Sequence, residues 1–198
     1  PEAIEVAVLA TPPGTRLDLL DALPGLKAVI VEKPLGATVA EAEAFATACD
    51  ARGITCQVNL PRRVDASHRA LAQGALARRI GRVQGAFLTY GNGLINNGTH
   101  MIDLARVLLG EVAHAAVPAG ATSFIEGPIP GDRNLPFCLT MESGIVVMGQ
   151  PLCFAAYREN GLDLWGEKGR LAIVQEGLRF CFYPRRDNRS TTGTHELA

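Results

Sequence analysis

The sequence lacks three features that would place it in other protein classes. It has no apolar run of the ~18 residues that cross a bilayer, and its five cysteines include no Cys-x-x-Cys pair. Its charges nearly balance, with 19 Lys and Arg against 20 Asp and Glu. We therefore expect no membrane span, no disulfide framework, no metal site and no nucleic-acid partner, because nucleic-acid binders carry a basic surface.

The composition that remains is typical of a globular protein. The chain has 198 residues, of which 47% are hydrophobic and 20% are charged, and this length suits one large domain or two small ones. No basic segment opens the chain, so we expect no signal peptide. An odd number of cysteines without paired spacing favours unpaired thiols and a cytoplasmic location.

The first sixty residues alternate between strand and helix patterns. Apolar runs predict strands at residues 4–9, 28–31 and 54–60. Helical patterns lie between them, at residues 15–23 and 38–52. Continuous apolar strands joined by helices predict a parallel sheet that is covered on both faces.

Both predicted helices carry signals at their ends. Thr15 is placed to cap the first helix, with Leu17 and Leu20 on its apolar side. Thr38 and Glu41 form a capping box at the start of the second. Its apolar stripe is Val39, Ala42, Phe45, Ala46 and Cys49, and Gly53 ends it.

The pattern changes after residue 60. Residues 65–79 predict a helix, 83–90 a strand, and a second helix begins at Asn97 or Thr99 and ends at Leu109. From Pro136 onward, strands separated by glycine turns predict an antiparallel meander packed on these helices. Residues 117–135 are predicted to form a long loop, and residues 184–198 a polar, frayed tail.

Two strand ends carry the residues of chemical interest in the first part. Ligands of open α/β sheets bind beyond the carboxyl ends of the strands, where this chain has Thr11-Pro12-Pro13-Gly14 and Glu32-Lys33-Pro34. Lys33 is either a solvated loop lysine or a ligand-binding group whose direction is restricted by Pro34. Glu32 could accept hydrogen bonds from ribose hydroxyls. No Gly-x-Gly-x-x-Gly motif is present, and Gly91-Asn92-Gly93 lacks the third glycine of a phosphate loop.

A third candidate lies at the start of the helix that ends at Leu109. His100 and Asp103 share one helix face, so the carboxylate could orient the imidazole of a neutral-pH acid or base. The alternative is a capping or core histidine beside an acid that favours the helix N-terminus. His68, His114 and His195 lack such a setting and are predicted to lie on the surface.

The ordered set of motifs resembles the Gfo/Idh/MocA oxidoreductases, which are NAD(P)-dependent sugar and polyol dehydrogenases. The motifs span residues 4–175 and are Ala10-Thr11-Pro12-Pro13-Gly14-Thr15, Val31-Glu32-Lys33-Pro34-Leu35, Arg62-Arg63-Val64-Asp65, Asn97-Gly98-Thr99-His100 with Asp103-Leu104, and Leu164-Trp165-Gly166-Glu167-Lys168-Gly169. No single motif is specific, but their order and spacing are.

This resemblance implies an α/β protein made of a partial Rossmann-type parallel sheet and an α+β domain with an open, mostly antiparallel sheet. The implied domains are residues 1–61 (cofactor), 62–183 (substrate and dimerisation) and a flexible tail, 184–198. The family's glycine loop has no counterpart, so we expect the N-terminal part of the Rossmann domain to be missing. The implied partners are a sugar-like small molecule and a second copy bound through the open sheet.

The resemblance also implies residue roles. His100 would be the general acid or base, and Lys33 would bind the substrate hydroxyl. The cofactor, NAD or NADP, would contact the residues Thr11, Pro12, Pro13, Glu32, Lys33, Pro34 and Arg62. The implied reaction transfers a hydride between nicotinamide and a carbinol carbon of a sugar, polyol or nucleotide-sugar.

One departure from the family pattern opens alternatives. Where the family usually has Asp four residues before the histidine, this chain has Asn96, which can bind a hydroxyl but cannot take its proton. His100 would then act alone or with support from Asp103. The alternatives are a non-catalytic sugar or nucleotide binder on the same scaffold and a truncated, inactive fragment.

Overall fold

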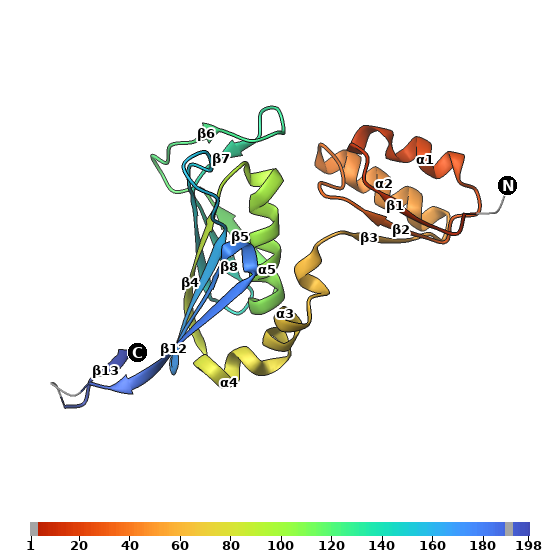
Figure 1. Cartoon of the computed structure of the whole chain (residues 1–198). Coiled ribbons are helices and arrows are strands. Elements are labelled where there is room, and N and C mark those ends of the chain that lie inside the picture. The colour runs from red at the N-terminus through yellow and green to blue at the C-terminus, as the bar shows by residue number, and fades with distance from the viewer. Residues whose placement is uncertain (1–3, 189–191) are drawn as a thin grey trace. The chain divides into compact units, whose positions relative to one another are not determined.

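The computed structural model describes residues 4–188 and 192–198. The chain divides into two compact units, Pro1–Leu60 and Pro61–Ala198. Figure 1 shows a small sheet with its helices in the first unit and a larger sheet with its helices in the second. Within the described residues, no helix has the length and apolar character needed to cross a bilayer.

The first unit is a three-stranded parallel sheet with two helices, as predicted. Its strands are β1 (Val6–Leu9), β2 (Ala28–Val31) and β3 (Thr55–Val58), in the order β1-β2-β3. Its helices are α1 (Arg16–Ala22) and α2 (Val39–Ala51). The register pairs Leu9 with Val31 and Val31 with Val58, so the three strands end at one edge of the sheet.

The predicted cover on both faces of this sheet is wrong for the described residues. Leu9, Val29 and Val31 are buried, and they pack with Leu20, Phe45 and Cys49 of the helices. On the other face, the side chains of Val6, Val8 and Ile30 are exposed. Successive crossovers of one hand in one direction place both helices on the same side of the sheet.

The helix ends follow the predicted signals only in part. Thr38 accepts a hydrogen bond from the Glu41 amide at 3.2 Å, but the Glu41 carboxylate bonds the amide of Ala37, at 2.9 Å, and not that of Thr38. Thr15 makes no capping bond to α1, because its hydroxyl donates to the Pro12 carbonyl. Leu17 and Val39, predicted on apolar faces, are exposed.

The second unit is built on an eight-stranded sheet in the order β13-β12-β11-β10-β4-β9-β8-β5. Its neighbours pair antiparallel except for β4 and β9, which pair parallel. Its strands are β4 (Val83–Tyr90), β5 (Val112–Ala116), β8 (Phe137–Met141), β9 (Val146–Pro151), β10 (Gly161–Gly166), β11 (Gly169–Val174), β12 (Arg179–Asp187) and β13 (His195–Leu197). The two-residue strands β6 (Phe124–Ile125) and β7 (Arg133–Asn134) pair inside the predicted long loop.

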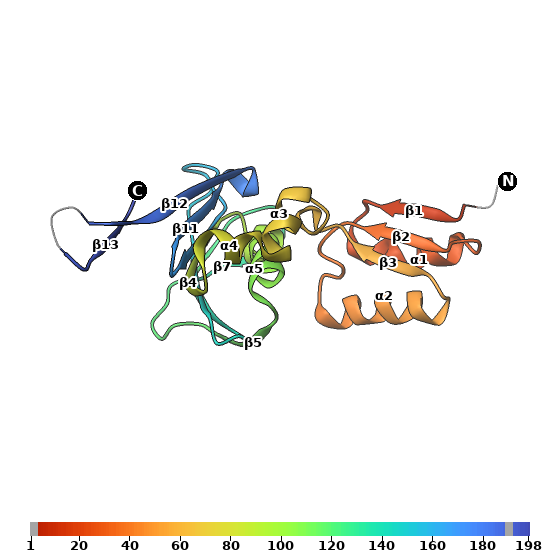
Figure 2. The same cartoon turned by 90° about the horizontal axis from the view of Figure 1, so that it is seen from below.

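One face of this sheet is covered and the other is open. Helix α5 (Thr99–Leu109) packs on β4 and β10, and its Leu104 is buried together with Leu88 and Leu164 of those strands. Figure 2 shows α5 together with the short helices α3 (Ala66–Ala70) and α4 (Leu76–Ile80). The predicted single helix at 65–79 is interrupted by a π-helical turn, Leu71–Ala75, because Gly74 adopts a left-handed φ of 105°.

Two further predictions about this unit are wrong. His68 is buried: its Nδ1 lies 2.8 Å from the carboxylate of Asp65, and its ring packs edge-on against Phe180. The tail predicted to fray contains the end of β12 and the strand β13, which pair antiparallel. Residues 189–191 of that tail lie outside the described residues. His114 and His195 are exposed, as predicted.

Candidate functional site

The first group of candidate residues lies at the carboxyl ends of β1 and β2. Since Leu9 and Val31 are parallel partners, the loops that start at Thr11 and Lys33 leave neighbouring strands at the same edge. The peptide bond between Lys33 and Pro34 is cis. Gly36 lies so close to α2 that an added Cβ would be 2.4 Å from the amide nitrogen of Ala42. The Lys33 loop is therefore packed tightly onto the helix that follows it.

Arg16 joins these two loops, and sequence reasoning missed it. Its Nε and Nη2 donate to the carbonyl of Thr11 at 3.2 and 2.8 Å, and its Nη1 donates to the carbonyls of Pro34 and Leu35 at 2.6 and 3.0 Å. Burial lowers the pKa of Arg16, against the opposing effect of the Glu32 charge. The available signal was a cation in the first turn of a helix, where the helix dipole disfavours it.

Glu32 is fixed at the same edge. Its Oε1 accepts a hydrogen bond from Nδ2 of Asn59, which follows β3, at 2.5 Å, and the Asn59 amide continues the pairing by donating to Val31 at 2.7 Å. A carboxylate held at the ends of three parallel strands suits the predicted contact with ribose hydroxyls. That contact stays a prediction, as do those of Thr11, Pro12, Pro13, Lys33 and Pro34.

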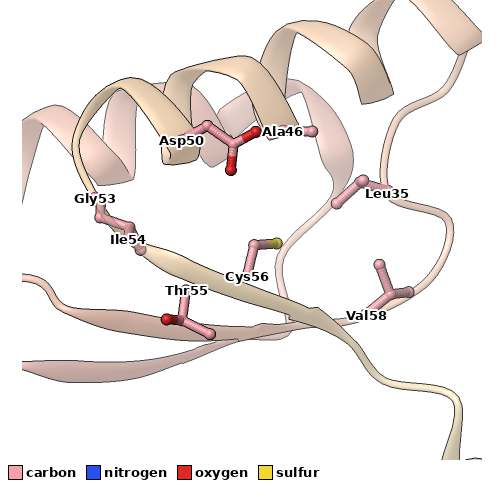
Figure 3. A pocket seen from close by; sticks show the side chains of 8 residues that line it. All are labelled: Leu35, Ala46, Asp50, Gly53, Ile54, Thr55, Cys56 and Val58. Atoms are coloured by element: carbon pink, nitrogen blue, oxygen red, sulfur yellow. The ribbon is translucent and has the colours of Figure 1, made fainter.

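The same unit has a hollow of about 540 Å³ that none of these candidate residues lines. Leu35, which follows Pro34, is one of its lining residues. Figure 3 shows it between α2 and β3, with the Cys56 side chain directed toward the helix. Burial raises the pKa of Cys56, and burial together with the nearby Cys56 raises the pKa of Cys49 to about 11. Both thiols are protonated at neutral pH, so this hollow offers no thiolate nucleophile.

The second group of candidate residues surrounds the start of α5. A π-helical turn, Leu94–Gly98, precedes α5 and carries Asn96, and His100 is the second residue of the helix. Within the described part of the chain, no three metal-ligating side chains gather here or elsewhere. Single π-helical turns are frequent at functional sites, and this one sets the direction in which α5 begins.

Acidic and amide side chains from distant loops hold the segment before α5. Asp132, which is 3% exposed, accepts hydrogen bonds from the amides of Ile95 and Asn96 at 3.0 and 2.9 Å. Three more backbone amides just before this turn are bonded by side chains. The Asn92 amide donates to Glu126, the Gly93 amide to Asn134 and the Gly91 amide to Asn160. The predicted long loop thus caps the π-helical turn that leads into α5.

The side chain of Asn96 takes part in this arrangement. Its Nδ2 donates to the carbonyl of Asn92 at 3.1 Å, one helical turn earlier. An amide accepts no proton at neutral pH, so Asn96 cannot replace a carboxylate as a base. The catalytic roles predicted for Asn96 and His100 remain to be tested.

Asp103 binds Arg63. Its two oxygens accept from Nε of Arg63 at 2.9 and 3.1 Å and from Nη2 at 2.7 Å, while the carboxylate is buried. The hydrogen bonds of Asp103 raise the pKa of the Arg63 guanidinium. The i, i+3 spacing placed Asp103 on the His100 face, but a guanidinium with two parallel donors is a better-matched partner. Support of His100 by Asp103 stays a prediction.

Arg62, predicted to contact the cofactor, is half-buried and lines a hollow of about 300 Å³ together with Asp65, His68, Glu176 and Gly177. Its Nη2 donates to the carbonyl of Glu176, and burial lowers its pKa. Within the described residues, Arg62 Nε and His68 Nε2 are buried nitrogens without a hydrogen-bond partner. Buried polar atoms without a partner are uncommon in folded proteins.

Comparison with known proteins assigns both units. Residues 1–60 match an oxidoreductase family with an NAD-binding Rossmann fold, and residues 60–172 match the GFO/IDH/MocA C-terminal domain. The chain therefore belongs to the Gfo/Idh/MocA oxidoreductase family. The predicted family and fold class are confirmed.

Individual relatives agree with this assignment. A D-apiose dehydrogenase from Paraburkholderia graminis is 34% identical over 135 residues, which cover 60% of this chain and 35% of that protein. Levoglucosan dehydrogenase, solved with NADH and levoglucosan, superposes with a TM-score of 0.75 at 20% identity over 98% of this chain and 60% of its own. The WlbA dehydrogenase from Bordetella pertussis, solved with NADH and UDP-GlcNAcA, gives 0.72 at 19% identity over 91% of this chain and 63% of its own. The chain thus spans about a third of the curated relative.

Proposed function

We propose that this chain takes part in an NAD(P)-dependent oxidoreductase that transfers a hydride between nicotinamide and a carbinol carbon of a sugar, polyol or nucleotide-sugar. The main support is that, in each of the two family-matched segments, buried side chains hold the backbone next to a candidate site residue. Arg16 ties the Lys33 loop at the strand ends of the first unit. Asp132 caps the segment that leads to His100 in the second.

The residues present fit a nicotinamide dinucleotide. A carboxylate, Glu32, is held at the carboxyl ends of parallel strands, where it can accept from ribose hydroxyls. When bound, the cofactor supplies the hydride acceptor or donor. The choice between NAD and NADP stays open.

In the proposed reaction, His100 takes the hydroxyl proton as a neutral imidazole, and Lys33 binds the hydroxyl oxygen. A positioned acid or base of this kind contributes about 10²–10⁴-fold to the rate. The hydrogen bonds from Asp132 fix the backbone of the turn that leads to His100. Asn96 contributes a hydrogen bond to the substrate and no proton transfer.

The test uses the full chain with His100→Ala and Lys33→Ala. The matched controls are His114→Ala, on the exposed strand β5, and Lys27→Ala, whose ammonium pairs with Glu5 on the surface. With NAD and NADP and a panel of D-apiose, levoglucosan and UDP-sugars, we expect turnover to fall at least 100-fold in the first two variants and less than twofold in the controls. Near-unchanged turnover in the first two would remove the proposed roles.

Asn96 supports a second candidate, a non-catalytic binder of sugars or nucleotides. An amide stands where the family usually has a carboxylate, and its side chain bonds the backbone of Asn92. If the chain binds NADH but turns over nothing on the substrate panel, this second function is correct, and turnover by Asn96→Asp would assign the loss of catalysis to the amide. An inactive fragment would show neither binding nor a rise in the unfolding temperature with NADH.

We also propose that the open face of the eight-stranded sheet pairs with a second copy. Val146 and Met148 of β9 and Trp165 of β10 are exposed on it. Arg170 bonds Asp163 there and lies 5.3 Å from the ring centre of Trp165. An exposed patch of apolar and aromatic side chains with one Arg is typical of interfaces. Met148→Glu should shift the mass in solution to that of the monomer.

A further inference from the structure

Arg16 connects two loops of the first unit through backbone carbonyls alone. The guanidinium leaves the first residue of α1 and is 2% exposed. One edge of it, Nε and Nη2, bonds the carbonyl of Thr11, which follows β1. The remaining nitrogen, Nη1, bonds the carbonyls of Pro34 and Leu35, which follow β2. Two hydrogen bonds from the guanidinium therefore reach each strand-end loop.

This arrangement is unfavourable as simple core packing. A buried cation costs free energy unless its charge and donors are compensated, and the start of a helix disfavours a positive charge. The four hydrogen bonds described for Arg16 all end on backbone carbonyls, and the Glu32 carboxylate acts on it only through its charge. An apolar side chain would avoid the desolvation of the cation but would leave the carbonyls of Thr11, Pro34 and Leu35 without these donors, so the bridge accounts for the guanidinium.

We propose that Arg16 is a positioning residue that sets the separation and orientation of the Thr11 loop and the Lys33–Leu35 loop. The identity of the ligand that these loops receive, a nicotinamide dinucleotide, rests on the proposed function. Arg16 itself is buried and contacts the backbone, so it acts through the two loops. Its loss allows each loop to move independently of the other.

The planar shape of the guanidinium is essential to this role. It presents donors in fixed directions on opposite sides of one plane, which lets it bond carbonyls on two segments at once. A lysine ammonium is a single point charge on a flexible stem, and it can satisfy one loop but not hold both in register. Arg16→Lys therefore separates the effect of charge from the effect of the bridge.

The experiment compares Arg16→Lys and Arg16→Gln with Arg52→Gln in the full chain. Arg52 is the matched control because it lies in the same unit and pairs with Asp21 on the surface, at 2.5 Å. Three quantities are measured on each protein: the unfolding temperature, the NADH dissociation constant from cofactor fluorescence, and backbone amide order parameters. Binding and order parameters are measured well below the unfolding temperature, so that each variant is folded.

We expect a local change. In both Arg16 variants the order parameters of Thr11, Leu35 and Gly36 should fall from about 0.85 toward 0.6, while those of the second half of α2 stay unchanged. The NADH dissociation constant should rise at least tenfold in both Arg16 variants. We expect this rise in Arg16→Lys even when that variant keeps most of the thermal stability. The Arg52→Gln variant should change less than twofold in binding and show no change in either loop.

Three results separate this proposal from the proposed function. If the order parameters of both loops are unchanged while the unfolding temperature falls, Arg16 serves only the core and the proposal is overturned. If the loops loosen as expected but the unaltered chain does not bind NADH, the positioning role stands and the nicotinamide assignment fails. If the variants loosen yet bind NADH with unaltered affinity, the loops do not form the cofactor site through Arg16, and the proposal is again overturned.

Discussion

The hydrogen bonds that Asp132 accepts from the turn before α5 give a prediction whose free-energy change can be worked out from the structure. Asp132→Ala removes two hydrogen bonds, from the amides of Ile95 and Asn96, to a carboxylate that is 3% exposed. Hydrogen bonds to charged groups contribute about 1.5–3 kcal/mol each. The carboxylate's own desolvation is relieved in the variant, so we expect a net loss of about 3 kcal/mol. With a urea m-value of about 2 kcal/mol/M, the unfolding midpoint should fall by about 1.5 M.

The conservative variant sharpens the same test. Asp132→Asn keeps one acceptor oxygen but turns an NH₂ donor toward the second amide, so it should recover less than half of the loss. Asp187→Ala is the surface control, since its carboxylate is 93% exposed, and it should cost under about 0.5 kcal/mol. A midpoint shift below about 0.3 M for Asp132→Ala, or full recovery in Asp132→Asn, would refute the capping argument.

Three further outcomes follow from the packing and the charges. Gly93→Ala should destabilise the second unit by about 2 kcal/mol or more in urea unfolding, because φ is 95° and the new Cβ would lie 2.1 Å from Oδ2 of Asp132. Burial raises the pKa of Cys49 from 9.0 to about 11. The stability that its neutral thiol contributes is therefore complete below pH 9 and is lost between pH 9 and 11. Unfolding temperatures measured across this range should decline less in Cys49→Ala. The hydrogen bond from the Arg158 guanidinium lowers the pKa of Glu176 below its usual 4.5. The stability that the Glu176 carboxylate contributes is therefore present above pH 4.5 and lost on acidification. In Glu176→Gln the unfolding temperature should depend less on pH below 4.5.

Sequence patterns predicted those elements correctly whose formation depends on neighbouring residues. The strand of residues 28–31 and the left-handed stop at Gly53 both depend on short-range chemistry, and both are found. The helix at 65–79 was wrong because Gly74 takes a left-handed conformation there, and its neighbours in sequence do not reveal this. His68 was wrong because only packing against Phe180 decides that its ring is buried.

The site residues divide in the same way. The sequence by itself determined the family, the alternation of strand and helix, and the candidates Lys33 and His100, because motif order and hydrophobic period are properties of the chain. Only the tertiary structure decided that Arg16 bridges two loops, that Asp103 binds Arg63 and that Asp132 caps the turn before α5. These are contacts between side chains and segments 18 to 40 residues apart, and hydrogen-bond partners at such separations are chosen by the folded geometry, which no local pattern encodes.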